Sequence, residues 1–151
     1  MTLEAVLAYL HIAAILMVTV FLTSQAALLR TEWLNAAAVR RLARVDLVYG
    51  IAALVLLATG FARTAWGIKG FGWYWSQPLL HLKVTLFVVI GLMSIVPTLR
   101  YRRWVKALDA GQGLPAEADV RATRKLVMWE AHLLVLVPIF AVCLARGIGT
   151  R

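Results

Sequence analysis

The sequence predicts an all-α integral membrane protein, a bundle of four helices that cross a lipid bilayer. Hydrophobic residues make up 62% of the 151 residues, whereas a soluble domain is about half apolar. The mean hydropathy of the chain is +0.82. The apolar residues also gather in long runs, without the alternation of apolar and polar residues that is typical of a strand.

Four of these runs are long enough to cross a membrane. The hydrocarbon core is about 30 Å thick and a helix rises about 1.5 Å per residue, so a span needs about 20 apolar residues. Each span must be helical, because backbone amides find no water to bond in lipid. We predict spans over Leu3–Leu29, Val45–Ala62, Pro78–Leu99 and Leu126–Leu144. Little else remains, which favours one transmembrane domain over residues 1–151.

The charges predict the orientation of the chain in the membrane. The net charge is +9, and two connections, 30–44 and 100–125, hold 11 of the 16 Lys and Arg residues. The positive-inside rule places these loops in the cytoplasm and both termini outside. The membrane topology explains the basic residues, so we expect no nucleic acid as a partner. The four spans make the lipid bilayer the expected partner. A homo-oligomer remains open.

Ionisable residues inside a membrane are costly and usually face the interior of a bundle. His11 and His81 are predicted at similar depth near the outer surface, with Lys83 and Arg63 close to that level. Two neutral imidazoles could hold the metal of a flat macrocycle such as haem, and the cations could neutralise its carboxylates. For each histidine taken alone, a hydrogen-bonded interfacial role is the alternative.

A second group of polar residues is expected nearer the inner surface. Asp46 and Tyr49 enter the second span from that side, and Glu130 lies about one turn inside the fourth. They could form a hydrogen-bond network that locks the helices, paired with Arg44 or Arg124, or they could carry protons as catalytic residues. His132, nearer the middle of the bilayer, is the alternative second haem ligand to His81.

Two further features concern the connections and the helix ends. The outer loop between the second and third spans is rich in aromatic residues and glycine, which is typical of an interfacial anchor. It could also be a lid, with Gly67, Gly70 and Gly72 as hinges. Pro97 and Pro138 are expected to kink or end the third and fourth helices.

Several short segments resemble an uncharacterised bacterial family of four-span membrane proteins. They are Tyr9-Leu10-His11, Leu28-Leu29-Arg30, the stretch 44–50, Lys69-Gly70, Lys83, the stretch 94–98 and Ala145-Arg146-Gly147. This resemblance covers nearly the whole chain and implies the fold, a bacterial inner membrane and no assigned activity.

A more distant resemblance is to the HemJ-type protoporphyrinogen oxidases, small membrane proteins that bind haem b. It is one of layout: His11 in the first span, Lys83 beginning the third and Glu130 beginning the last. The Tyr-Leu-Pro-Arg stretch of that family is replaced here by residues 23–26, and its Asn-Glu-Val-Pro run by residues 129–132. The resemblance implies haem or tetrapyrrole binding.

The sequence therefore leaves three functions open. The first is a haem b-binding redox protein that passes electrons between a quinone or tetrapyrrole and a partner. In it, His11 is the axial ligand, His81 or His132 the second ligand, Lys83 and Arg63 bind carboxylates, and Glu130, Asp46 and Tyr49 serve proton transfer. The second is a non-enzymatic accessory or assembly protein. The third is a small-molecule or ion carrier that uses Asp46 and Glu130.

Overall fold

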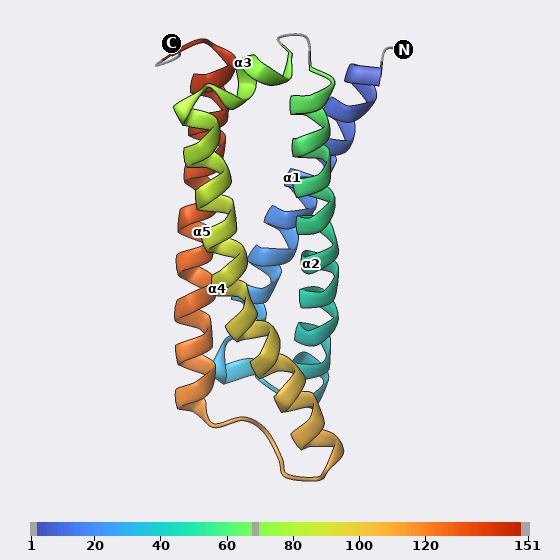
Figure 1. The fold of residues 1–151 in the computed structure, drawn as a ribbon. Helices are drawn as coiled ribbons and strands as arrows, with labels where there is room; N and C mark the ends of the chain where they lie inside the picture. Colours follow the sequence, from blue (N-terminus) through green and yellow to red (C-terminus); the bar gives the residue numbers. More distant parts are fainter. Residues whose placement is uncertain (1–2, 68–69, 149–151) are drawn as a thin grey trace.

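Four long helices form a bundle in the computed structural model, which describes residues 3–67 and 70–148 (Figure 1). All four are long and apolar enough to cross a membrane. The predicted all-α fold is therefore confirmed. The elements in chain order are α1 (Leu3–Leu28), the 3-10 helix η1 (Thr31–Trp33), α2 (Ala36–Ala65), α3 (Phe71–Trp75), α4 (Pro78–Asp109) and α5 (Glu117–Ala145).

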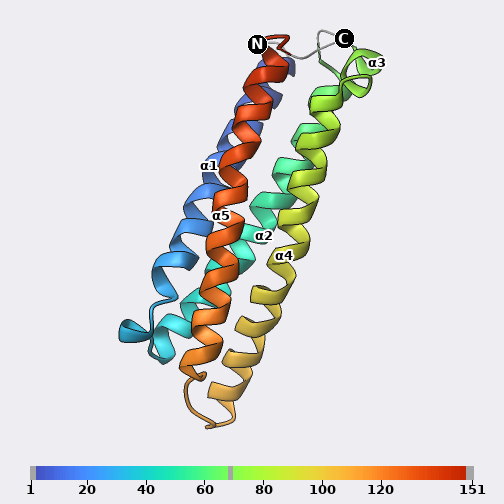
Figure 2. The ribbon, with the colours of Figure 1, turned by 90° about the vertical axis from the view of Figure 1, so that its left-hand side faces the viewer.

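The long helices are arranged as two hairpins, α1 with α2 and α4 with α5. The hairpins come together at the end that carries the connections 29–35 and 110–116, here called the basic end (Figures 1 and 2). At the opposite end, here called the α3 end, they stand apart and α3 lies across the top (Figure 1). The bundle is therefore tightly closed at one end and spread at the other.

The buried core reflects this difference between the ends. Many of its most buried apolar side chains belong to the basic half: Leu22, Leu29, Val39, Leu42, Tyr101, Trp104, Val120 and Val127. Large apolar side chains such as Leu16, Leu54, Leu92 and Ile139 are exposed on the outer surface of the helices. Such a surface is expected of helices whose solvent is lipid.

The helices at the basic end extend beyond the predicted apolar runs. α2 begins at Ala36, where the Asn35 side chain accepts a hydrogen bond of 2.9 Å from the Ala38 amide. α4 continues to Asp109, whose carboxylate lies 2.7 Å from Arg40. The basic segments 30–44 and 100–125 are thus largely helical. An apolar run shows which part of a helix lies in lipid, but the helix itself can continue into the polar residues beyond it.

The aromatic connection at the α3 end contains a short helix that the sequence did not predict. Gly70 precedes it with φ of +79°, a conformation that favours glycine. Gly67 is needed for space, because a Cβ there would lie 2.4 Å from the Arg63 carbonyl oxygen. A Cβ at Gly72 would meet nothing within 4 Å. Of the three glycines suggested as hinges, therefore, only Gly67 and Gly70 lie at positions where the local structure requires glycine.

The two prolines lie inside helices that continue past them. α4 runs on for 12 residues after Pro97, and α5 for seven residues after Pro138. Of the two predicted effects, ending the helix does not occur at either proline. A proline has no backbone N–H, so one carbonyl oxygen in the preceding turn loses its hydrogen bond. Within a membrane, groups on neighbouring helices can satisfy that oxygen, and the helix continues.

Candidate functional site

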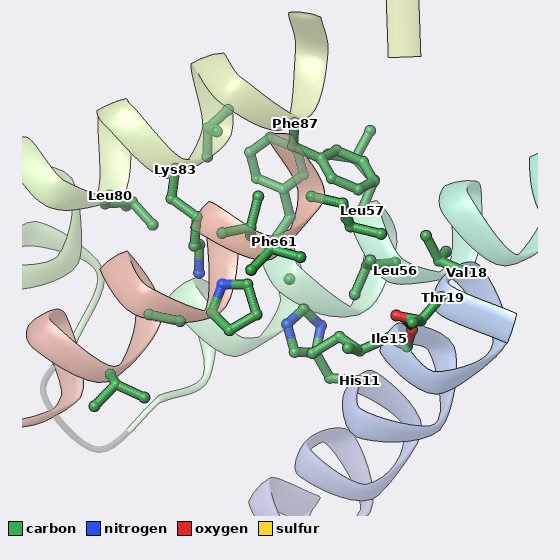
Figure 3. A pocket seen from close by; sticks show the side chains of 18 of the residues that line it. His11, Ile15, Val18, Thr19, Leu56, Leu57, Phe61, Leu80, Lys83 and Phe87 are labelled. Carbon is green, nitrogen blue, oxygen red and sulfur yellow. Dashed lines mark hydrogen bonds between the residues drawn. The ribbon is translucent and has the colours of Figure 1, made fainter. Parts of the chain in front are cut away.

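A cavity of about 600 Å³ lies between the two hairpins, in the half of the bundle nearer α3. Figure 3 shows side chains that line it. All four long helices contribute to its wall, and Trp75 of α3 lines it too. On α1 the lining residues run from His11 to Thr23, a length of about 18 Å at 1.5 Å per residue. The cavity is therefore elongated along the helices and covers about half of the bilayer thickness.

The cavity wall is apolar over most of this length. Leu22, Leu56, Phe87 and Leu134 are among its lining residues. The hydroxyls of Thr19 and Thr23, which also line it, donate to carbonyl oxygens of their own helix at 2.8 to 2.9 Å. These two hydroxyl protons are therefore used within α1, and the inner part of the cavity presents a mainly hydrocarbon surface.

His11 is held in the cavity wall by α2. Its Nδ1 lies 2.9 Å from the Thr59 hydroxyl oxygen, which itself lies 2.8 Å from the Val55 carbonyl oxygen. If the Thr59 hydroxyl donates its proton to the Val55 carbonyl oxygen, its own oxygen accepts a hydrogen bond from His11 Nδ1. The imidazole proton is then on Nδ1, and the lone pair of Nε2 is free. Gly60 makes room for the ring, because a Cβ there would lie 3.3 Å from His11 Cε1.

Lys83 brings a positive charge to the same cavity from α4 (Figure 3). The lining residues include no aspartate or glutamate. The ion pairs found within residues 3–67 and 70–148 join Arg40 to Asp109 and Arg121 to Glu117, so Lys83 is in neither. Arg63 of α2 is near enough to interact electrostatically with Lys83 and His11, and it adds further positive charge.

Trp75 adds a third polar group at this end of the cavity. Its ring stacks on Phe61 with centroids 5.9 Å apart and planes inclined by 13°. The indole Nε1 is buried and has no hydrogen-bond partner in the part of the chain that the structure describes. An orphaned N–H donor is unfavourable. Lys83 thus offers a charged hydrogen-bond donor to a bound molecule, beside the Trp75 ring in the cavity wall.

The other two histidines are not among the residues that line the cavity. His81 is exposed, and its Nε2 lies 2.9 Å from the Trp75 carbonyl oxygen. His132 is exposed on α5 and bonds the Met128 carbonyl oxygen of its own helix. The structure therefore does not bring His81 or His132 to His11 as a second ligand, because the helices turn those side chains outward.

The predicted inner group does assemble, although with different partners. The charges of Asp46 and Glu130 interact with each other, and both act on Tyr49. Asp46 accepts a hydrogen bond of 3.0 Å from Thr98. No ion pair with Arg44 or Arg124 is found within the described ranges, so the arginine pairing that the sequence suggested is not formed.

Several site residues escaped the sequence analysis. Thr59 and Trp75 at the cavity, and Thr98 and Tyr101 in the inner group, were not identified as partners. A threonine in an apolar run could have drawn attention to Thr59. Its pairing with His11, 48 residues away, depends on how α1 and α2 pack.

Comparison with known proteins gives a family and nothing more specific. The model of a family described as "Predicted membrane protein (DUF2214)" matches residues 3–149. The search of curated proteins and the search of solved structures found no match.

Proposed function

The chain belongs to the DUF2214 family of predicted membrane proteins, and we propose that it binds an amphipathic, anionic ligand in the cavity between its hairpins. The observation that carries this proposal is Lys83. Its side chain lines an apolar cavity, and no described acidic residue pairs with it. An ammonium group in such surroundings is unfavourable unless an opposite charge accompanies it. A bound anion would supply that charge.

The shape of the cavity suggests how the ligand would lie. Lys83 and the Trp75 ring belong to helical segments at the α3 end, whereas Leu22 and Ala131 line the cavity towards the middle of the bundle. A ligand with an acceptor group at the α3 end and an apolar body along the helices would satisfy both parts. Long-chain carboxylates have this form.

Binding of a fluorescent fatty acid tests the proposal. We expect purified protein in detergent to bind cis-parinaric acid more tightly than its methyl ester, which lacks the charge. Lys83→Met should weaken binding of the acid about tenfold or more, since a hydrogen bond to a charged group contributes about 1.5–3 kcal/mol. Binding of the ester should hardly change. Lys125→Met, at an exposed position of α5, is the matched control.

Two results would contradict the proposal. One is equal affinity of the protein for the acid and the ester. The other is a loss of acid binding in Lys125→Met as large as that in Lys83→Met, which would show that the effect depends on net charge and not on the cavity.

Haem b is a second candidate for the ligand, and the observation that favours it is the bonding of His11. A metal-ligating histidine commonly donates its other ring N–H to a hydrogen-bond acceptor, and the Thr59 hydroxyl oxygen lies 2.9 Å from His11 Nδ1, where it can accept such a bond. His11 would be the axial ligand, and Lys83 would neutralise a carboxylate of the macrocycle. Haem would supply one-electron redox chemistry.

The visible spectrum separates haem from a long-chain ligand. If haem b binds, protein expressed with added haem shows a Soret band that shifts on reduction with dithionite and is lost in His11→Phe. A colourless preparation that still binds cis-parinaric acid would exclude haem and keep the broader proposal. Loss of both signals would contradict both.

A further inference from the structure

A second polar site lies near the basic end, apart from the cavity, and each long helix contributes to it. Its members are Gln25 of α1, Asp46 and Tyr49 of α2, Thr98 and Tyr101 of α4, and Glu130 of α5. All except Thr98 are buried. They lie close in sequence to the arginines at this end, such as Arg44 and Arg100, and so just inside the basic surface.

Two hydrogen bonds connect these helices, and two polar atoms are left over. Thr98 donates to Asp46 at 3.0 Å, and the Tyr101 hydroxyl donates to the Gln25 side-chain oxygen at 3.1 Å. The Glu130 Oε1 and the Gln25 Nε2 are buried with no hydrogen-bond partner in the described part of the chain. Glu130 is only 1% exposed and Gln25 2%. Each orphaned atom is unfavourable unless a small group binds there.

The charges point to the kind of group that binds. Asp46 is 7% exposed, and its charge interacts with that of Glu130. Neither carboxyl has an ion-pair partner among residues 3–67 and 70–148. Two carboxylates that are buried together in a low-dielectric interior repel one another and are each poorly solvated. A positive charge between them would remove both penalties.

The surrounding helices supply little compensating charge. Gln25 of α1 is neutral, and α2 and α4 present the Tyr49 and Tyr101 hydroxyls. Arg102 of α4 interacts with Asp46 but is exposed, so it is no buried counter-ion. A divalent ion is disfavoured, because no group of three His, Cys, Asp or Glu side chains that could hold a metal occurs in the described residues.

We propose that Asp46 and Glu130 form an exchangeable site for one small monovalent cation, either a proton or Na⁺. The oxygens of both carboxyls are hard ligands that suit either ion. The site is separate from the cavity, so the proposal does not depend on the identity or existence of the cavity ligand.

Infrared spectroscopy of the full chain in lipid measures this directly, through the C=O stretch of a protonated carboxyl. If the site binds protons, the C=O band of protonated Glu130 will disappear as the pH rises and will not change when Na⁺ is added. If it binds Na⁺, the band will be lost when Na⁺ replaces choline at constant pH and ionic strength. Glu130→Gln should remove the band, and Glu117→Gln, an exposed change on the same helix, should not.

The remaining outcomes overturn the proposal. A Glu130 band that responds to neither pH nor Na⁺ would mean a fixed, structural acid. Absence of any such band under all conditions would mean a carboxylate that is permanently ionised. ¹³C labelling of glutamate shifts the Glu130 band away from that of Asp46 in the wild-type chain, so the test stands even if Glu130→Gln fails to fold.

Discussion

Lys83 combines a charge with surroundings that do little to stabilise it, which is typical of a residue kept for binding. Removing an uncompensated charge from an apolar site relieves an unfavourable interaction. We therefore expect Lys83→Met to stabilise the ligand-free protein by about 1 kcal/mol, seen as a higher midpoint of thermal unfolding in detergent. A lower midpoint would show that Lys83 has a stabilising partner and would remove the main support for an anionic ligand.

Thr59 and Thr23 allow a matched test of the bond to His11. Both hydroxyls bond to carbonyls of their own helices, but only that of Thr59 also lies within hydrogen-bond distance of a side chain on another helix. Thr59→Val removes the hydroxyl that lies 2.9 Å from His11 Nδ1, and we expect a loss of about 1 kcal/mol in unfolding free energy. Thr23→Val should change it by less than about 0.5 kcal/mol. Chemical denaturation in mixed micelles measures the difference, and equal effects would contradict the assigned bond.

At the scale of elements, the approach of α1 to α2 depends on a small residue. A Cβ at Gly60 would lie 3.3 Å from the His11 ring, whereas one at Gly91 of α4 would meet nothing within 4 Å. We expect Gly60→Leu to displace His11 into the cavity and abolish binding of cis-parinaric acid. Gly91→Leu should leave binding intact. If both variants bind normally, the cavity is not the binding site.

The start of α2 provides a second prediction at this scale. Asn35 accepts a hydrogen bond from the Ala38 amide and so caps the helix. Asn35→Ala should lower the unfolding free energy by about 1 kcal/mol, whereas Asn35→Asp, which keeps the acceptor, should change it little. Thermal unfolding of the two variants side by side measures this, and an equal loss in both would show that the cap contributes nothing.

At the scale of the whole molecule, the orientation in the membrane is the property to test. The positive-inside rule places the basic end in the cytoplasm and the α3 end outside. In a Cys143→Ala background, Ser76→Cys should react with an impermeant maleimide on intact cells. Gln112→Cys should react only after the cells are permeabilised. The reverse pattern would place the cavity on the cytoplasmic side and contradict the predicted topology.

The sequence by itself determined that this protein is a bundle of four long apolar helices. Each helix is a local property: its length follows from an uninterrupted apolar run, and its backbone bonds are made within the run. The same local information placed His11, Lys83, Asp46 and Glu130 inside spans. The Asn35 cap and the short helix after Gly70 are also local features, although the sequence analysis did not predict them.

Only the tertiary structure decided which polar residues meet. His11 pairs with Thr59 and not with His81, and Tyr101 reaches Gln25, 76 residues earlier. Such pairs depend on the rotation and tilt of each helix, which are set by packing against its neighbours. The spread of the two hairpins, and with it the cavity, arises at that level too, because it depends on how helices distant in the sequence lie against one another.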